Sequence, residues 1–160
     1  MDNKTSKIKV LYVCTQNIFR SMSADYLSKK HIKENNIKGY DIDSCGTIAD
    51  SWGSPYDHTL KMLKIRGIDA TSHKNKQINQ KLVDESKFII CMTLDHKDYI
   101  RKNFNVTPYL FNELALGVMT DLEDDNEASF NCSLTQFIEK TINHIDKHIP
   151  KIFESLEKIN

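Results

Sequence analysis

The sequence predicts a doubly wound α/β fold, in which helices flank a four-stranded parallel sheet. Two observations carry this prediction. Short, nearly continuous apolar runs, such as residues 8–13 and 88–92, are typical of strands buried on both faces. Helix-compatible stretches alternate with these runs along the 160 residues. Such alternation is typical of parallel sheets, whose functional residues gather at the carboxyl ends of the strands.

The first half of the chain supplies two strands and two helices. Residues 7–13 predict a buried strand, and residues 21–35 predict the helix that follows it. Residues 40–44 alternate polar and apolar side chains and predict the second strand. A loop at residues 48–55 contains the only tryptophan, and the helix predicted at residues 56–66 stops at a glycine.

The second half completes the sheet. Residues 88–92 predict a third buried strand, and Thr93 is placed to cap a helix over residues 94–102. Residues 108–111 predict a short fourth strand. The last helix begins near Ser133, where the Ser-x-x-Gln spacing makes a capping box.

The last helix carries an apolar stripe that we expect to lie wholly in the core. Pro150 falls inside this pattern and is expected to kink or end the helix. His144 and His148 have the spacing of metal ligands, but no acidic or cysteine side chain is placed to complete a site, so we expect histidines at the rim. The members of the stripe are Leu134, Phe137, Ile138, Ile142, Ile145, Ile149 and Ile152.

Composition limits the classes of partner. The 22 Lys and Arg balance the 22 Asp and Glu, so no global field attracts nucleic acid or an anionic membrane. Residues 1–7 lack the apolar segment of a signal peptide, and no apolar run reaches membrane-spanning length. The length predicts a single domain over residues 1–160.

The four cysteines are scattered without a Cys-x-x-Cys pair. This spacing argues against a zinc site and against a disulfide framework, so we expect neither a metal nor a cofactor. Free thiols fit a reducing cytoplasm. The four residues are Cys14, Cys45, Cys91 and Cys132.

The loop that joins the first strand to the first helix is the main candidate for a functional site. Cys14 and Arg20 stand six positions apart at its two ends. Backbone N–H groups converge where a strand turns into a helix N-terminus, and the helix dipole favours an anion there and the thiolate form of a cysteine. A guanidinium at the same loop can hold two phosphate oxygens. The loop therefore predicts a nucleophile inside an oxyanion cradle, which suits covalent phosphoryl transfer.

A structural role for the cysteine is the alternative. A lone cysteine at the end of a strand is most often a core residue. The strand before Cys14, the helix after it and Ser21 beside the arginine favour the catalytic interpretation.

The acidic segment at residues 121–125 offers an acid to protonate a leaving oxygen. Most of its carboxylates are expected to be solvated. Asp121 follows the apolar residues 116–119, which could bring it to the edge of the cleft, where a desolvated carboxyl could keep its proton near neutral pH.

These motifs resemble the low-molecular-weight protein tyrosine phosphatases, from about residue 7 to the end of the chain. The family signature Cys-x-Gly-Asn-x-Cys-Arg-Ser reads here as residues 14–21, and Asp-Ser-Ala-Gly-Thr reads as residues 43–47. The family segment His-x-x-Arg-Gln is similar to residues 73–77. The family also has a phenylalanine nine residues after its acid, a spacing that Asp121 and Phe130 keep and that favours Asp121 over its acidic neighbours.

The resemblance implies a protein-tyrosine phosphatase. Cys14 takes the phosphoryl group, Arg20 binds the phosphate and its transition state, and Asp121 protonates the tyrosyl oxygen and then activates water. Ser44 supports the loop as a partner of Asn17. The implied substrates are tyrosine-phosphorylated proteins, with inorganic phosphate as product or inhibitor. The residues expected to form the cradle or wall the cleft are Thr15, Gln16, Asn17, Ile18, Phe19, Ser21 and Trp52, of which Trp52 has ordinary loop packing as its alternative role.

Several positions depart from the family pattern. Gln16 replaces a glycine, Phe19 replaces the second cysteine, Met22 replaces a common proline, and Leu122 replaces the proline after the acid. These changes leave two other interpretations open. An arsenate reductase of the same fold would use Cys91 in a disulfide relay, but no second relay cysteine follows it, so a buried Cys91 is expected. A phosphotyrosine-binding module with weak turnover is the other.

Overall fold

The computed structural model describes residues 5–50, 52–122 and 133–160. Within these ranges the chain forms a four-stranded sheet in the order β2-β1-β3-β4, and every neighbouring pair is parallel. The predicted doubly wound α/β class and the four-stranded parallel sheet are confirmed. The strands are β1 (Ile8–Cys14), β2 (Tyr40–Gly46), β3 (Phe88–Cys91) and β4 (Tyr109–Leu110).

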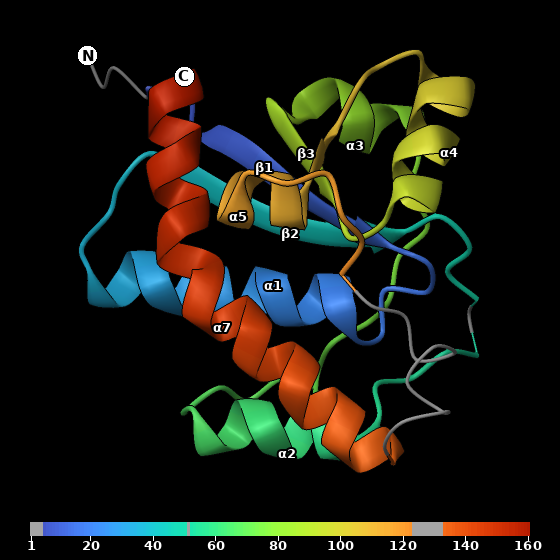
Figure 1. The fold of residues 1–160 in the computed structure, drawn as a ribbon, viewed down its shortest axis with the longest axis vertical. Coiled ribbons are helices and arrows are strands. Elements are labelled where there is room, and N and C mark those ends of the chain that lie inside the picture. Colours follow the sequence, from blue (N-terminus) through green and yellow to red (C-terminus); the bar gives the residue numbers. More distant parts are fainter. Residues whose placement is uncertain (1–4, 51, 123–132) are drawn as a thin grey trace.

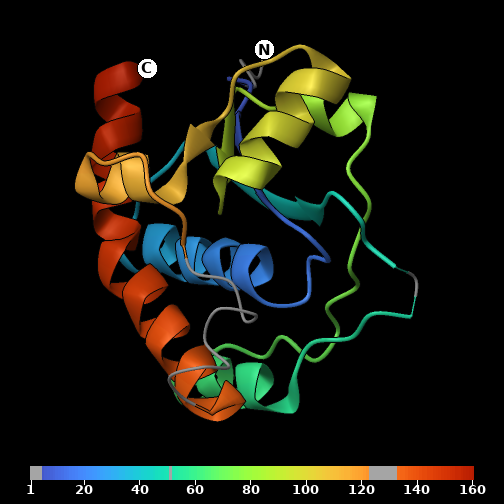
Figure 2. The same cartoon turned by 45° about the vertical axis from the view of Figure 1, so that its right-hand side comes forward.

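Helices cover both faces of the sheet (Figures 1 and 2). On one face lie α1 (Arg20–Glu34), α5 (Phe111–Leu116) and the long α7 (Leu134–Ile159), which packs on both of them. The helix α2 (Asp57–Ile65) packs against α1 and α7. On the other face lie α3 (Gln80–Glu85) and α4 (Leu94–Phe104). None of the helices in the described ranges has both the length and the apolar character needed to cross a bilayer.

The central strand β1 divides its side chains between the two halves of the core. Val10, Tyr12 and Cys14 belong to the cluster formed with α1 and α7, while Leu11 and Val13 belong to the cluster on the side of α3 and α4. This alternation follows from the pleat of a strand, whose successive side chains point to opposite faces. Cys14, the last residue of β1, therefore faces the N-terminal end of α1.

Two helices escape the sequence prediction. The helices α3 and α5 are six residues each, which is too short for an amphipathic period to stand out. Asn79 does cap α3, because its side chain accepts the backbone N–H of Leu82 at 2.9 Å. The predicted fourth strand shrinks to Tyr109–Leu110, because α5 begins at the next residue.

At Pro150 the sequence predicts that the last helix is kinked or ended. The helix α7 does not end there but continues to Ile159, and its axis changes direction along its length in Figure 1. Burial of Ile149 and Ile152 on the core holds the helix together across the missing hydrogen bond. Leu134, expected in the core, is 49% exposed, because it lies in the first turn, where α7 begins beyond the edge of the core.

Candidate active site

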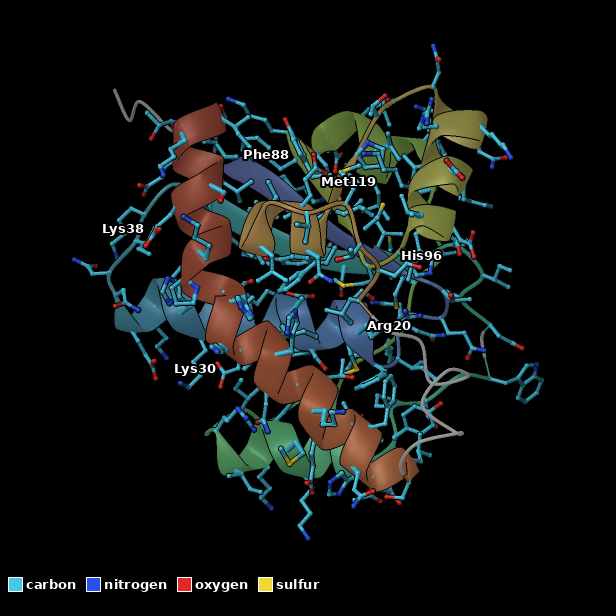
Figure 3. All side chains as sticks on the ribbon, viewed as in Figure 1. Arg20, Lys30, Lys38, Phe88, His96 and Met119 are labelled. Atoms are coloured by element: carbon cyan, nitrogen blue, oxygen red, sulfur yellow. The ribbon has the colours of Figure 1, made fainter. Side chains whose placement is uncertain are left out.

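The loop between β1 and α1 puts the predicted nucleophile and arginine at its two ends. Cys14 closes β1 and is 3% exposed; Arg20 opens α1 and is 6% exposed. Figure 3 shows Arg20 at the end of α1 nearest this loop. Phe19 stands at the N-cap position and offers no side-chain acceptor. The first N–H groups of α1 are therefore left for an anion, as an oxyanion cradle requires.

Two donors converge on the sulfur of Cys14. The Ser21 hydroxyl lies 2.9 Å from Sγ, and the backbone N–H of Asn17 donates to Sγ at 3.3 Å. Ser21 Oγ also donates to the Cys45 carbonyl oxygen at 3.3 Å, so its proton lies between that oxygen and the sulfur. Hydrogen bonds of this kind stabilise a thiolate more than a thiol, which suits both the attack and the later departure of the sulfur.

Asn17 holds the loop in shape. Its backbone is left-handed, with φ 60°, and its side-chain Nδ2 donates to both Ser21 and Ser44 at 2.9 Å. Its Oδ1 accepts the backbone N–H of Lys76, and its carbonyl oxygen accepts the His73 Nε2–H at 2.7 Å. All the hydrogen-bonding groups of a fully buried amide are thus used, so the loop is shaped before any ligand arrives.

A buried carboxylate ends this network. Asp25, 4% exposed, accepts the Ser44 hydroxyl at 2.8 Å, and Lys29 Nζ lies 2.8 Å from its other oxygen. Burial raises the pKa of Asp25, and Lys29 opposes that shift. Because Ser44 donates to Asp25, its oxygen is free to accept from Asn17. The hydrogen bonds that lead from Asp25 toward Cys14 therefore have a defined direction: Ser44 donates to Asp25, and Asn17 donates to Ser44.

The predicted acid lies close to the arginine but is not desolvated. Asp121 is exposed, and its Oδ1 accepts the backbone N–H of Leu94 at the start of α4 at 2.7 Å. The next residue, Leu122, is buried; its N–H donates to Met92 O at 2.8 Å, and its carbonyl accepts Arg20 Nη1 at 3.3 Å. The expectation of a desolvated carboxyl is therefore not met, because the chain turns Leu122, and not Asp121, into the core. Asp124, Asp125 and Phe130 lie outside the described residues.

Gln16 on the cradle loop and Trp52 on a neighbouring loop are both exposed. Asn75 Nδ2 donates to Gln16 O at 3.3 Å and to Asp50 O at 2.6 Å, which ties the loop that carries Trp52 to the cradle. Trp52 is 90% exposed, so ordinary loop packing does not account for it. Ile18 lies beside Gly53 and is half-buried.

Gln16 and Phe19 fit the loop despite replacing family residues. Gln16 is exposed and is not among the residues with positive φ, so the backbone there does not require a glycine. Phe19 is 5% exposed and packs edge-on against Tyr56 and Phe137, with ring centroids 6.1 and 5.9 Å away. The place of the family's second cysteine is thus taken by a core aromatic.

The other described cysteines face away from Cys14. Cys45 and Cys91 are fully buried in the cluster on the side of α3 and α4, and burial raises the pKa of both thiols. The expectation of a buried Cys91 is confirmed. An inert, apolar environment of this kind does not suit a disulfide relay. Cys132 lies outside the described residues.

His96 was missed by the sequence reasoning. It is 5% exposed on α4, and its Nε2 lies 2.9 Å from the Thr15 hydroxyl in the cradle. The Thr-x-x-His spacing from Thr93 could have suggested a capping role. Nothing local could have paired His96 with a residue 81 positions earlier.

His144 and His148, predicted at the rim, have protein partners. Among residues 5–50, 52–122 and 133–160, no group of three or more His, Cys, Asp or Glu side chains could hold a metal ion. His144 Nε2 pairs with Asn112 Oδ1 at 3.0 Å, and His148 Nδ1 with the His144 carbonyl at 2.7 Å, so both histidines are partly buried side chains with protein partners.

Comparison with known proteins identifies one family. The family model described as low molecular weight phosphotyrosine protein phosphatase matches residues 9–159. A protein-arginine-phosphatase from Geobacillus stearothermophilus is 30% identical over 96 residues, and a low molecular weight phosphotyrosine protein phosphatase from Saccharomyces cerevisiae is 33% identical over 99 residues. Each match spans 60% of this chain, and 62% and 61% of the relatives' own lengths.

The fold is also that of known structures. The solution structure of a low molecular weight protein tyrosine phosphatase from Bacillus subtilis superposes with a TM-score of 0.81 at 21% identity, covering 94% of this chain and 98% of that one. At this identity the likeness establishes the fold.

The first prediction concerns Gly46, which pairs with Cys14 in the sheet. A Cβ here would lie 2.4 Å from the Thr15 carbonyl oxygen, a backbone atom that no rotamer change can move. Gly46→Ala should push the cradle out of shape, with a loss of about 1–3 kcal/mol in unfolding free energy and a large fall in activity. Gly117→Ala is the control, because its Cβ would meet nothing within 4 Å and its cost is confined to a positive φ. Full activity of Gly46→Ala would contradict the close approach.

The second prediction concerns the pH dependence of stability. Because burial raises the folded-state pKa of Asp25, its carboxyl favours folding most below the unfolded pKa, and this contribution is lost as the pH rises through the folded pKa. In Asp25→Asn that loss is absent. Urea unfolding at several pH values between about 4 and 7 should show the stability of wild type, relative to the variant, falling with pH. A rise instead would mean that Lys29 outweighs burial, and Lys29→Met should then abolish it.

Proposed function

The chain belongs to the low molecular weight phosphotyrosine protein phosphatase family, and we propose that it hydrolyses phosphotyrosine and small aryl phosphates through a phosphocysteine intermediate. The observation that carries the proposal is the Cys14 sulfur, which faces a preformed cradle with a hydroxyl 2.9 Å away. Such an arrangement fits a cysteine-dependent phosphoric monoester hydrolase that needs no cofactor.

The first step transfers the phosphoryl group to sulfur. The Cys14 thiolate attacks phosphorus, the bond to the tyrosyl oxygen breaks, and Asp121 supplies the proton that this oxygen takes. The N–H groups of residues 15–20 and the Arg20 fork bind the three remaining phosphate oxygens. The Arg20 contact with the Leu122 carbonyl supports this assignment, because it links the arginine to the segment that carries the acid.

The second step hydrolyses the thiophosphate. Asp121, now a carboxylate, takes a proton from a water molecule, and the oxygen of that water attacks phosphorus. The sulfur leaves as a thiolate, stabilised by the Ser21 hydroxyl and the Asn17 N–H. Inorganic phosphate is released as the product, and it is expected to inhibit by occupying the same cradle.

A phosphorylated protein is the proposed substrate, and two amino acids are candidates for the modified residue. The apolar side chains of Ile18, on the cradle loop, and of Trp52, on the loop tied to it through Asn75, are the proposed walls of the cleft, and they suit a phenyl ring better than a charged guanidinium. Phosphoarginine is the second candidate, because a relative at 30% identity is named as a protein-arginine-phosphatase. Buried free thiols are consistent with a cytoplasmic location, which we also propose.

The decisive experiment is a turnover assay with p-nitrophenyl phosphate at mildly acidic pH, followed by phosphotyrosine and phosphoarginine peptides. Wild type should release phosphate, and Cys14→Ser should bind phosphate analogues without turnover. Arg20→Lys should lose about 10²–10³-fold in kcat, because a point charge cannot replace a bidentate fork. Tight binding without release by wild type would favour a binding module, and faster release from phosphoarginine would favour the second substrate.

The role of Asp121 as general acid is tested by comparing substrates with a poor and a good leaving group. Asp121→Asn keeps an acceptor for the Leu94 N–H but cannot donate the catalytic proton. It should lower hydrolysis of phenyl phosphate by roughly 10²–10⁴-fold and damage p-nitrophenyl phosphate hydrolysis far less, because nitrophenolate leaves without a proton. Asp124→Asn and Asp125→Asn are the controls. Equal losses on both substrates would point to phosphate binding or folding, and a selective loss at Asp124 would move the acid three residues along.

A further inference from the structure

The first turn of α4 contacts both halves of the candidate active site. His96 reaches the Thr15 hydroxyl in the cradle at 2.9 Å, and the backbone N–H of Leu94 donates to Asp121 Oδ1 at 2.7 Å. At the preceding strand end, Met92 O accepts the N–H of Leu122 at 2.8 Å. Figure 3 shows His96 at the end of α4 nearer Arg20. One turn of helix therefore lies between the nucleophile loop and the acid segment.

The hydrogen bonds of His96 assign its ring proton. The backbone N–H of Thr93 donates to Nδ1 at 3.2 Å, so Nδ1 is the acceptor nitrogen of a neutral ring. Nε2 then carries the proton and donates it to Thr15. In return, the Thr93 hydroxyl accepts the backbone N–H of His96 at 3.3 Å, which completes a capping box.

Capping alone does not require a histidine. An asparagine or glutamine at this position could accept the Thr93 N–H equally well. The imidazole ring also holds a rigid donor, Nε2, on the side opposite Nδ1, and this donor contacts the Thr15 hydroxyl of the cradle. The ring is also 95% buried, so its orientation is determined by packing as well as by hydrogen bonds. The feature that distinguishes His96 from an ordinary cap is therefore its contact with Thr15.

We propose that His96 is a positioning residue that sets the separation between the phosphate cradle and Asp121, through Thr15 on one side and the first turn of α4 on the other. The inference rests on the proposed function, because Asp121 matters here as the general acid. In-line transfer needs the acid oxygen and the sulfur on opposite sides of phosphorus, so an error of about 1 Å between the two loops lowers the rate steeply.

A double-mutant cycle separates this role from capping. His96→Asn keeps the acceptor for Thr93 but is too short for Thr15, and Thr15→Val keeps the shape of threonine without its hydroxyl. Each should lower kcat for phenyl phosphate about 5- to 10-fold, the worth of one hydrogen bond, with little change in KM and a smaller effect on p-nitrophenyl phosphate. The double variant should be no worse than either single variant. His148→Asn, the same substitution on α7, should leave kcat unchanged.

Additive losses, equal losses on the two substrates, or an unchanged kcat would overturn the proposal. A measurement that does not depend on turnover tests the positioning role of His96 separately from the proposed function. Amide hydrogen exchange of residues 15–20 should accelerate in both single variants and to the same extent, while the melting temperature of His96→Asn stays near that of wild type. If wild type hydrolyses neither substrate, the proposed function fails, and exchange alone decides whether His96 holds the cradle.

Discussion

The buried amide of Asn17 is the constraint on which the rest of the site depends. A left-handed residue turns the chain sharply after Cys14, and a side chain that is used at every hydrogen-bonding position holds that turn. Such a backbone conformation is uncommon for any residue except glycine, and asparagine tolerates it better than most others. Because the turn is held from inside, the cradle N–H groups are oriented without a ligand, which is the preorganisation that the proposed phosphate binding requires.

The sequence predicted this region well because its determinants are local. One short segment contains a buried strand, a Cys and an Arg six positions apart, and the start of a helix. The positions of Cys14, Arg20 and Ser21 around one loop could therefore be predicted together. The contacts that complete the site come from elements remote in sequence, namely Ser44 on β2, which links Asn17 to Asp25, and His96 on α4. No periodicity or spacing relates such residues, and only the parallel order of the strands brings them to one edge of the sheet.

The errors have equally physical causes. The exposure of Asp121 could not be inferred from the apolar run before it, because Leu122 is the residue that turns inward and anchors the segment beside Met92. At Pro150 the helix continues rather than ends, because the buried stripe on both sides of the proline is long enough to carry the helix past one lost hydrogen bond. The short α3 and α5 depend on tertiary packing, which no window of six residues can reveal.

A series of directed hydrogen bonds connects the buried carboxyl of Asp25 to the sulfur of Cys14. An ionised Asp25 can only accept, so Ser44 must donate to it and must accept from Asn17. The second Nδ2 hydrogen of Asn17 goes to the Ser21 oxygen, so the single Ser21 proton lies between the Cys14 sulfur at 2.9 Å and the Cys45 carbonyl oxygen at 3.3 Å. A neutral Asp25 would remove this bias, because a carboxylic acid can also donate. Burial of an ionised Asp25 is costly, and its charge orients Ser44, Asn17 and Ser21 in turn, the last of which lies beside the Cys14 sulfur. The raised pKa of Asp25 and the order of the hydrogen bonds beside the Cys14 sulfur are therefore two effects of one placement.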